Sequence, residues 1–165
     1  MKKTGLVIAL SIVLLIVFSC SAMAFEQSIS VNPLGAALGY ANAKYETNAP
    51  NTENGSVTYG CTVFSMDNVT GFEFDYGSRH YFKEVQNGGY WGGEIGFASL
   101  TSTNSNYING TGLGVVLSLG YKKTFESGLT LDGGVSAAVV TAVSSRGGSA
   151  TAIGAGLYVS VGYAW

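Results

Sequence analysis

Apolar and polar residues alternate along most of the chain after residue 24, and clusters of turn-forming residues separate the alternating runs. A period of two is typical of β-strands that have one apolar face. No stretch after residue 24 shows a sustained helical period, and glycines interrupt any helix that one could draw there. The pattern predicts strands over residues 55–66, 70–83, 89–102, 110–125, 129–143 and 150–165.

Residues 27–48 form a longer stretch, about twice the length of an ordinary strand, and they contain Pro33. Because proline is tolerated in a sheet mainly at an edge or in a turn, we divide the stretch into strands 27–32 and 36–48. This division gives eight strands. An unbroken first strand would give seven, and the sequence leaves both counts open.

The last predicted strand separates its residues most clearly into two faces. Alternate positions are apolar and most of the positions between them are small: Leu157, Val159, Val161, Tyr163 and Trp165 against Gly156, Ser160, Gly162 and Ala164. A lipid-exposed barrel strand requires such an apolar outer face. We expect this strand to pair with the first one, because an open sheet edge in lipid leaves backbone groups unsatisfied. The predicted fold is all-β: an eight-stranded antiparallel up-and-down transmembrane β-barrel whose narrow interior is filled by side chains.

The first 24 residues have the composition of a cleaved secretory signal peptide. Lys2 and Lys3 precede an apolar run over residues 6–18, and small residues occupy positions 21–24. Residues 25–165 then form a single barrel domain. Cys20 lies in a stretch similar to the acylation site of bacterial lipoproteins, although Phe18 stands where such sites have a small residue. Acylation of Cys20 therefore stays open as an alternative.

The composition indicates a protein that does not face water on all sides. Only 11% of the residues are charged, whereas soluble proteins carry about 25%. Without Lys2 and Lys3, six basic residues remain against ten acidic ones, which argues against nucleic-acid binding. Cys61 is the only cysteine after residue 24, so the predicted domain has no internal disulfide.

The signal peptide, the eight short strands and the final residues VSVGYAW resemble the small outer-membrane β-barrel proteins of Gram-negative bacteria. Residues 31–46, VNPLGAALGYANAKYE, are similar to the opening of an uncharacterised subgroup of the outer membrane protein β-barrel domain family. The resemblance implies location in the outer membrane and contact with its lipid. It also implies insertion by the barrel assembly machinery, which recognises a terminal aromatic strand. We expect a monomer.

Several aromatic residues are expected at the membrane surface. If both chain ends are periplasmic, so are the turns at 49–54, 84–88 and 126–128. Aromatic residues at headgroup depth form the girdle of a membrane barrel. We assign to this girdle, and to the terminal assembly signal, Phe82, Trp91, Tyr121, Phe125, Tyr163 and Trp165. The alternative is a soluble core rich in Phe and Tyr.

Charged residues are expected inside the barrel. Arg79, Glu94, Lys122 and Asp132 lie on successive strands, alternate in sign and fall on the face opposite the apolar one. Opposite charges on neighbouring strands attract, so we expect Glu94 to lie between Arg79 and Lys122. Further residues extend this lining: Lys44, Glu46, Glu73 and Asp75. The predicted result is a polar plug, and a proton or ion path is the alternative.

The sequence offers little for catalysis. His80 is the only histidine, and by alternation it shares the apolar face with Phe74 and Phe82, away from the acids. Gly112 and Gly114 precede no helix that could bind phosphate, and one histidine with one cysteine makes no metal site. We expect no enzyme and no cofactor.

The favoured function is a structural or surface-contact role for an outer-membrane barrel without a wide pore. The loops opposite the periplasmic turns, 66–71, 103–110 and 144–149, are short and rich in Asn, Ser and Gly, too short for a large binding site. One alternative is a soluble or lipid-anchored periplasmic barrel that binds a small apolar ligand as lipocalins do. The other is a lipid-modifying membrane enzyme.

Overall fold

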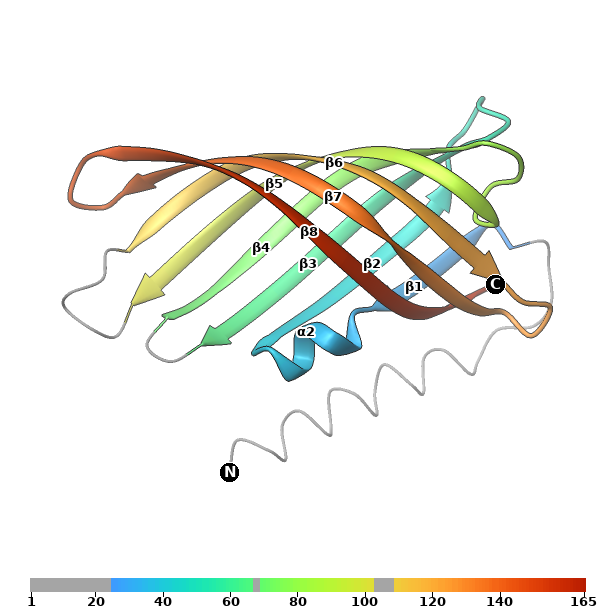
Figure 1. The fold of residues 1–165 in the computed structure, drawn as a ribbon, viewed down its shortest axis with the longest axis horizontal. Helices are drawn as coiled ribbons and strands as arrows, with labels where there is room; N and C mark the ends of the chain where they lie inside the picture. The colour runs from blue at the N-terminus through green and yellow to red at the C-terminus, as the bar shows by residue number, and fades with distance from the viewer. Residues whose placement is uncertain (1–24, 67–68, 103–108) are drawn as a thin grey trace.

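A computed structural model describes residues 25–66, 69–102 and 109–165, which form one closed antiparallel barrel (Figure 1). The strands are paired in chain order, so the predicted all-β, eight-stranded, up-and-down barrel is confirmed. The predicted signal peptide, with Cys20, lies outside the described residues and stays a prediction. The strands are β1 Gln27–Val31, β2 Tyr40–Asn48, β3 Gly55–Met66, β4 Val69–Tyr81, β5 Gly88–Ser102, β6 Gly110–Thr124, β7 Leu129–Ser144 and β8 Ser149–Ala164.

Residues 27–48 contain two strands, as the sequence analysis preferred, but the predicted strand 36–48 is wrong at its start. A short helix, α2, spans Pro33–Ala37, and β2 begins only at Tyr40. The Asn32 side chain caps this helix by accepting a hydrogen bond from the Gly35 N–H at 2.9 Å. Pro33, whose fixed φ suits the first helical turn, follows the cap. A positive φ of 93° at Gly39 then returns the chain to the sheet.

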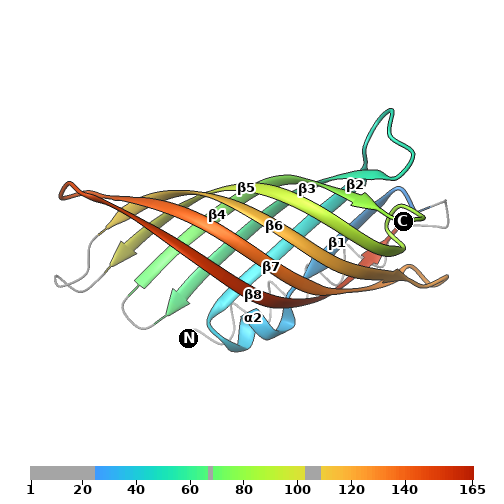
Figure 2. The same ribbon diagram turned by 45° about the horizontal axis from the view of Figure 1, so that its top comes forward.

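The alternation in the sequence is realised as an outer apolar face and an inner polar face. On β6, for example, Leu113, Leu117 and Tyr121 are exposed on the outside, whereas Lys122 and Thr124 are buried inside. The other long strands repeat this pattern and run obliquely around the barrel (Figure 2). A lipocalin-like barrel has the reverse arrangement, with its apolar face inside, so the structure argues against that alternative.

The first and last strands pair with each other at only one end of the barrel. We call this the closed end; it is where β1 begins and β8 finishes. There β8 pairs with β1 through residues 161–164, so the predicted pairing of the last strand with the first is confirmed over four residue pairs. At the opposite end, the far end, β8 continues to Ser149 while β1 stops at Val31.

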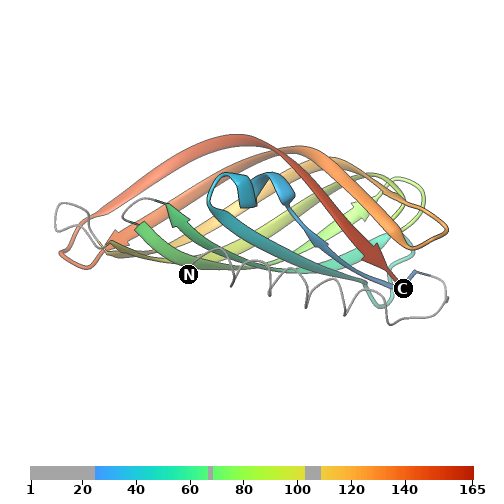
Figure 3. The ribbon, with the colours of Figure 1, turned by 90° about the horizontal axis from the view of Figure 1, so that it is seen from below.

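The outer edge of residues 149–160 of β8 therefore has no strand partner within the described part of the chain. We call the interruption between this edge and β2 the seam. The helix α2 lies beside it, beneath the arch of β8 (Figure 3). Ile153 and Leu157, on the outer face of this edge, are 81% and 85% exposed. No helix among the described residues is long and apolar enough to cross a membrane.

Candidate functional site

A single buried carboxylate organises the closed end of the barrel interior. Glu46 points inward from β2, and its Oε1 accepts hydrogen bonds from Ser56 Oγ at 2.5 Å and from Tyr81 Oη at 2.6 Å. Its Oε2 accepts from Arg79 Nη1 at 3.1 Å and from Lys122 Nζ at 2.9 Å. Charge-assisted bonds of this kind are stronger than bonds between neutral groups. Four strands are thereby joined through one side chain.

Asp132 on β7 provides the second buried carboxylate. Its Oδ2 accepts from Arg79 Nη1 at 2.8 Å, and its Oδ1 accepts from Tyr90 Oη at 2.6 Å. The Arg79 guanidinium also lies 4.3 Å from the centre of the Tyr90 ring, within the range of a cation–π interaction. Because all these charges are paired and hydrogen-bonded, their burial is tolerated. We call the group Glu46, Tyr81, Arg79, Tyr90, Lys122 and Asp132 the charged plug.

The turn between β4 and β5 covers the charged plug at the closed end. Gln86 folds inward from this turn with a φ of 59° and is fully buried. Its side chain accepts a hydrogen bond from Lys122 Nζ at 3.2 Å and donates one to Asn48 Oδ1 at 3.2 Å. Lys122 Nζ reaches β1 as well, through Ser28 Oγ at 2.7 Å. The turn therefore contributes directly to filling the lumen.

Two glycines make room for the tyrosines of the interior. The hydroxyls of Tyr90 and Tyr158 lie 2.5 Å apart. A side chain at Gly120 would collide with both hydroxyls, and one at Gly134 would collide with that of Tyr158. Glycine at these two positions thus permits aromatic residues to cross a narrow barrel.

Of the eight predicted lumen residues, the structure brings four together in the charged plug, namely Arg79, Lys122, Asp132 and Glu46. The expected position of Glu94 between Arg79 and Lys122 is wrong. Glu94 pairs instead with Lys44 at 2.6 Å, and Lys44 Nζ lies 3.4 Å from Asp75 Oδ1. The strand register explains the difference, because Glu94 is opposite Val116 on β6, whereas Lys122 is opposite Gly88.

Lys44, Asp75 and Glu94 form a separate ion group, nearer the far end of the lumen. Glu73 is also directed inward, two residues before Asp75 on β4. Sequence reasoning gave Glu46 only a secondary place and did not assign Tyr81, Tyr90 or Gln86 to the interior. Alternation from Arg79 would have placed Tyr81 inside, whereas nothing in the sequence pattern indicates that Gln86 folds inward.

The predicted aromatic girdle lies around the closed end. Phe82, Trp91, Tyr121 and Phe125 are exposed on the outer face, whereas Tyr163 and Trp165 are half-buried. The Trp165 ring lies 6.5 Å from that of Tyr45, and Trp91 lies 5.8 Å from the ring of His80. His80 is therefore exposed among aromatic residues, with the buried acids on the other side of the wall.

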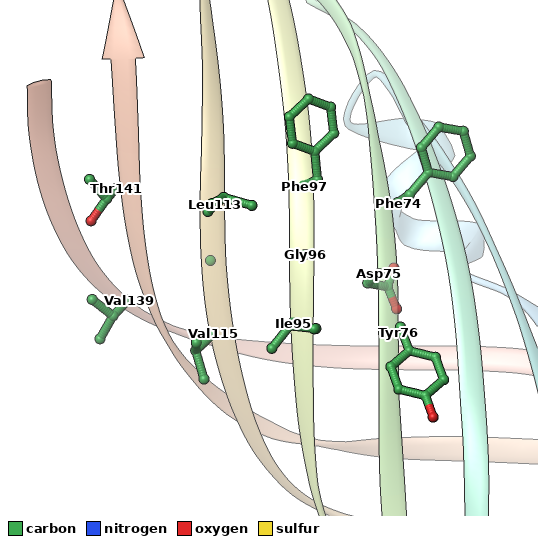
Figure 4. Close-up of a pocket in the computed structure, with 11 residues that line it drawn as sticks. Phe74, Asp75, Tyr76, Ile95, Gly96, Phe97, Leu113, Val115, Val139 and Thr141 are labelled. Atoms are coloured by element: carbon green, nitrogen blue, oxygen red, sulfur yellow. The ribbon is translucent and has the colours of Figure 1, made fainter.

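An apolar hollow of about 620 Å³ lies on the outer face between β4 and β7. Figure 4 shows its side chains along neighbouring strands, with no side chain at Gly96. Its lining is almost entirely hydrocarbon and ring, as expected for a surface that contacts acyl chains. The walls include Phe74, Tyr76, Ile95, Phe97, Leu113 and Val139.

The comparisons with known proteins assign no family to this chain. No family model matches the sequence, so the predicted family and subgroup are not confirmed, and no curated protein matches it either. Among solved structures, the chain is similar to the translocator domain of the autotransporter NalP from Neisseria meningitidis. The TM-score is 0.32 and the identity is 16%, over 97% of this chain and 68% of that one. Similarity at this level supports no inference about function.

Proposed function

We propose that this protein is an integral outer-membrane β-barrel with a structural or surface-contact role and without a wide pore. The observation that supports the proposal is the inversion of polarity: the large apolar side chains are exposed on the outside, and the ion pairs are buried inside. In water, exposing so many apolar side chains would be unfavourable, since each Å² of apolar surface in contact with water costs about 25 cal/mol. In lipid, the same surface is matched to its surroundings.

The closed end supplies the second argument. A membrane barrel carries aromatic girdles at headgroup depth, and the aromatic residues around the closed end fit one of them. If that end is periplasmic, the seam and α2 lie toward the cell surface. We propose outer-membrane lipid and the barrel assembly machinery as partners, after secretion with the predicted signal peptide, and a monomeric state.

The charged plug supports a lumen without a wide passage. Tyr81 and Tyr90 are fully buried on the neighbouring strands β4 and β5, and their rings lie 5.2 Å apart inside the barrel. An eight-stranded barrel is just wide enough to be filled by its own side chains. We propose no catalytic role, because the buried acids of the charged plug lie on the other side of the wall from His80.

The test is fractionation of cells that produce the full chain. The protein is expected in the outer-membrane fraction, to require detergent for extraction, and to migrate differently on a denaturing gel before and after boiling. Recovery from osmotic-shock fluid without detergent would contradict the proposal. Release of the protein by Cys20→Ser would instead favour a lipid-anchored barrel.

A further inference from the structure

The free edge of β8 presents backbone groups in a regular row. Gln27 and Trp165 exchange two backbone hydrogen bonds, at 3.2 and 2.9 Å. Such hydrogen-bonded pairs recur at every second residue of an antiparallel ladder, so the odd-numbered residues of β8 direct their N–H and C=O groups toward β1. Pairing with β1 stops at Val161, and the same groups of residues 151, 153, 155, 157 and 159 point into the seam. Within the described residues, no backbone hydrogen bond reaches them from that side.

This edge lacks the features that normally prevent another strand from joining it. Natural edge strands are very short, or they carry lysine, proline or a bulge. Residues 147–165 contain no charged residue and no proline, and β8 pairs with β7 without a bulge from residue 149 to 163. Ile153 and Leu157 on this edge are more exposed than any other large apolar residue in the described part of the chain. The helix α2 therefore leaves the outer side of the edge uncovered.

Part of the edge lies at membrane depth in the proposed orientation. A transmembrane strand needs about 9 to 11 residues, which counted from Ala164 reaches roughly residue 154. The free backbone groups of residues 155, 157 and 159 then lie at the depth of the hydrocarbon, where unpaired groups are strongly unfavourable. Residues 149–153 extend further toward the far end, so a partner can reach the edge from there.

An extended chain is the partner that this row of groups fits. The donors and acceptors recur at every second residue along one line, which is the spacing of a neighbouring strand. Hydrocarbon has no polar group to offer, and a helix uses its backbone groups internally. An added strand would also continue the line of β1, which already pairs with β8 in antiparallel register.

The residues that follow β1 in this chain are unsuited to the position. If the register of Val31 with Val161 continued, Leu34 would lie opposite Tyr158, whose hydroxyl contacts Tyr90 inside the lumen. Leu34, and the leucine four residues later, would then both face the polar interior. The first residue of α2 is a proline, which has no N–H to donate. The same residues in a helix keep both leucines exposed.

A second copy of this chain does not fit the edge either. Two copies inserted in the same direction have β8 strands that run the same way, so an antiparallel ladder between them would need one copy to be inverted. A parallel contact between the two identical edges requires a half-turn about the strand axis. That rotation would join the outer face of one barrel to the inner face of the other and turn polar side chains toward lipid.

We propose that the free edge of β8 binds an extended, uncharged segment of another protein as an added antiparallel strand along residues 151–157. The side chains of the segment opposite Ile153, Ala155 and Leu157 face lipid and are apolar, because opposite residues share a face of the sheet. On its inner face β8 has only small residues here, and a side chain at Gly154 would meet no described atom within 4 Å. The alternate side chains of the segment therefore have room and can be polar. This inference rests on the proposed membrane location and deepens the surface-contact role.

The test is amide hydrogen exchange, followed by NMR, of the full chain folded in detergent micelles. The probe is a capped peptide of four alternating valine–serine pairs with every serine nitrogen methylated, so that only the edge of valine N–H groups can pair. At saturating peptide, exchange of the N–H groups of Ile153, Ala155 and Leu157 is expected to slow about tenfold or more. The even-numbered residues between them already pair with β7 and should not change.

The matched control is the same peptide with the valine nitrogens methylated instead. It has the same composition, but its valine edge can no longer donate to β8, and its other edge would turn the serines toward lipid. We expect no slowing of exchange with this peptide. Equal slowing by the two peptides would show that binding does not use backbone pairing and would overturn the added strand.

A pair of proline variants tests the free edge without any peptide. Ala155 and Ala137 lie opposite each other on β8 and β7. Because opposite residues exchange both backbone bonds or neither, the N–H of Ala137 points toward β6, where Leu117 is opposite, whereas that of Ala155 points into the seam. Ala155→Pro is expected to leave the amount of heat-modifiable barrel nearly unchanged, and Ala137→Pro to reduce it strongly. Equal loss of folded barrel in both variants would overturn the free edge.

The remaining outcomes distinguish other occupants and the two proposals. Slow exchange of the odd-numbered N–H groups without peptide would overturn the inference: in a monomer the chain would close its own seam, and in a dimer a second copy would cover the edge. A folded barrel in micelles whose edge exchanges rapidly with and without peptide would overturn the added strand alone. A chain that folds in water without detergent would overturn the membrane location and, with it, this inference.

Discussion

At the scale of single residues, the charge of Glu46 has the greatest structural consequence. It forms ion pairs with both Arg79 and Lys122 and also accepts hydrogen bonds from two hydroxyl groups. The sequence could indicate that this residue faces inward, because alternation fixes the face. It could not indicate which residues Glu46 contacts, since the tilt of the strands displaces neighbouring side chains by several residues. The wrong partners predicted for Glu94 illustrate this displacement.

Glu46→Gln is expected to lower the free energy of unfolding by about 3 to 5 kcal/mol, the usual cost of removing one partner from a buried ion pair. The substitution leaves Arg79 and Lys122 without their shared anion. The measurement is urea unfolding in detergent micelles. Glu73→Gln is the matched control, since the described structure gives Glu73 no ion pair, and it should cost less than about 1 kcal/mol. An equal loss of unfolding free energy in the two variants would contradict the central role of Glu46.

Glu94→Lys is expected to destabilise the barrel through repulsion from Lys44. The exchange of both charges, Lys44→Glu with Glu94→Lys, should recover part of the loss. The double-mutant cycle on unfolding free energies should give a coupling of about 0.5 to 3 kcal/mol. The cycle of Glu94 with Lys122 is the control and should give almost none, because the structure places no contact between them. A large coupling of Glu94 with Lys122 and almost none with Lys44 would instead support the arrangement expected from the sequence.

At the scale of elements, the strands were predictable and the helix was not. Period-two alternation with turn clusters located all eight strands to within a few residues. In residues 33–37 the same pattern was ambiguous, because Asn32 and Pro33 suit a turn as well as a helix cap. The short β1 that results leaves residues 149–160 of β8 without a strand partner on that side within the described residues. No periodicity in the sequence of β8 indicates this, because strand pairing is a property of two segments.

Trp165→Asp is expected to reduce strongly the amount of folded protein in the membrane. Trp165 closes the barrel: its N–H donates to the Gln27 carbonyl at 2.9 Å, and its ring lies near Tyr45 in the aromatic girdle. A charge at that depth would oppose both insertion and ring contact. The measurement is the quantity of heat-modifiable protein in outer membranes. Trp165→Phe is the control and should assemble normally, and normal levels of the aspartate variant would contradict this account of closure.

At the scale of the whole molecule, the apolar outer surface and the charged interior depend on each other. The outer surface keeps the barrel in lipid, and the narrow interior then has to be filled by polar groups that pair among themselves. The sequence indicated this division, since both faces follow from one alternation. It did not indicate that filling is uneven, with a dense plug at the closed end and a cavity of about 200 Å³ beside the seam.

This uneven filling predicts how the barrel behaves in a planar bilayer under voltage. The native protein is expected to show no steady open channel, because the charged plug crosses the lumen between β2, β4 and β7. Tyr90→Ala removes an aromatic ring from the plug together with its bond to Asp132, and should produce open-channel events. His80→Ala is the control, because His80 lies on the outer face of β4, beside Arg79 in the chain but on the other side of the wall. Open channels of equal size in the native protein and in both variants would show that the plug does not close the lumen.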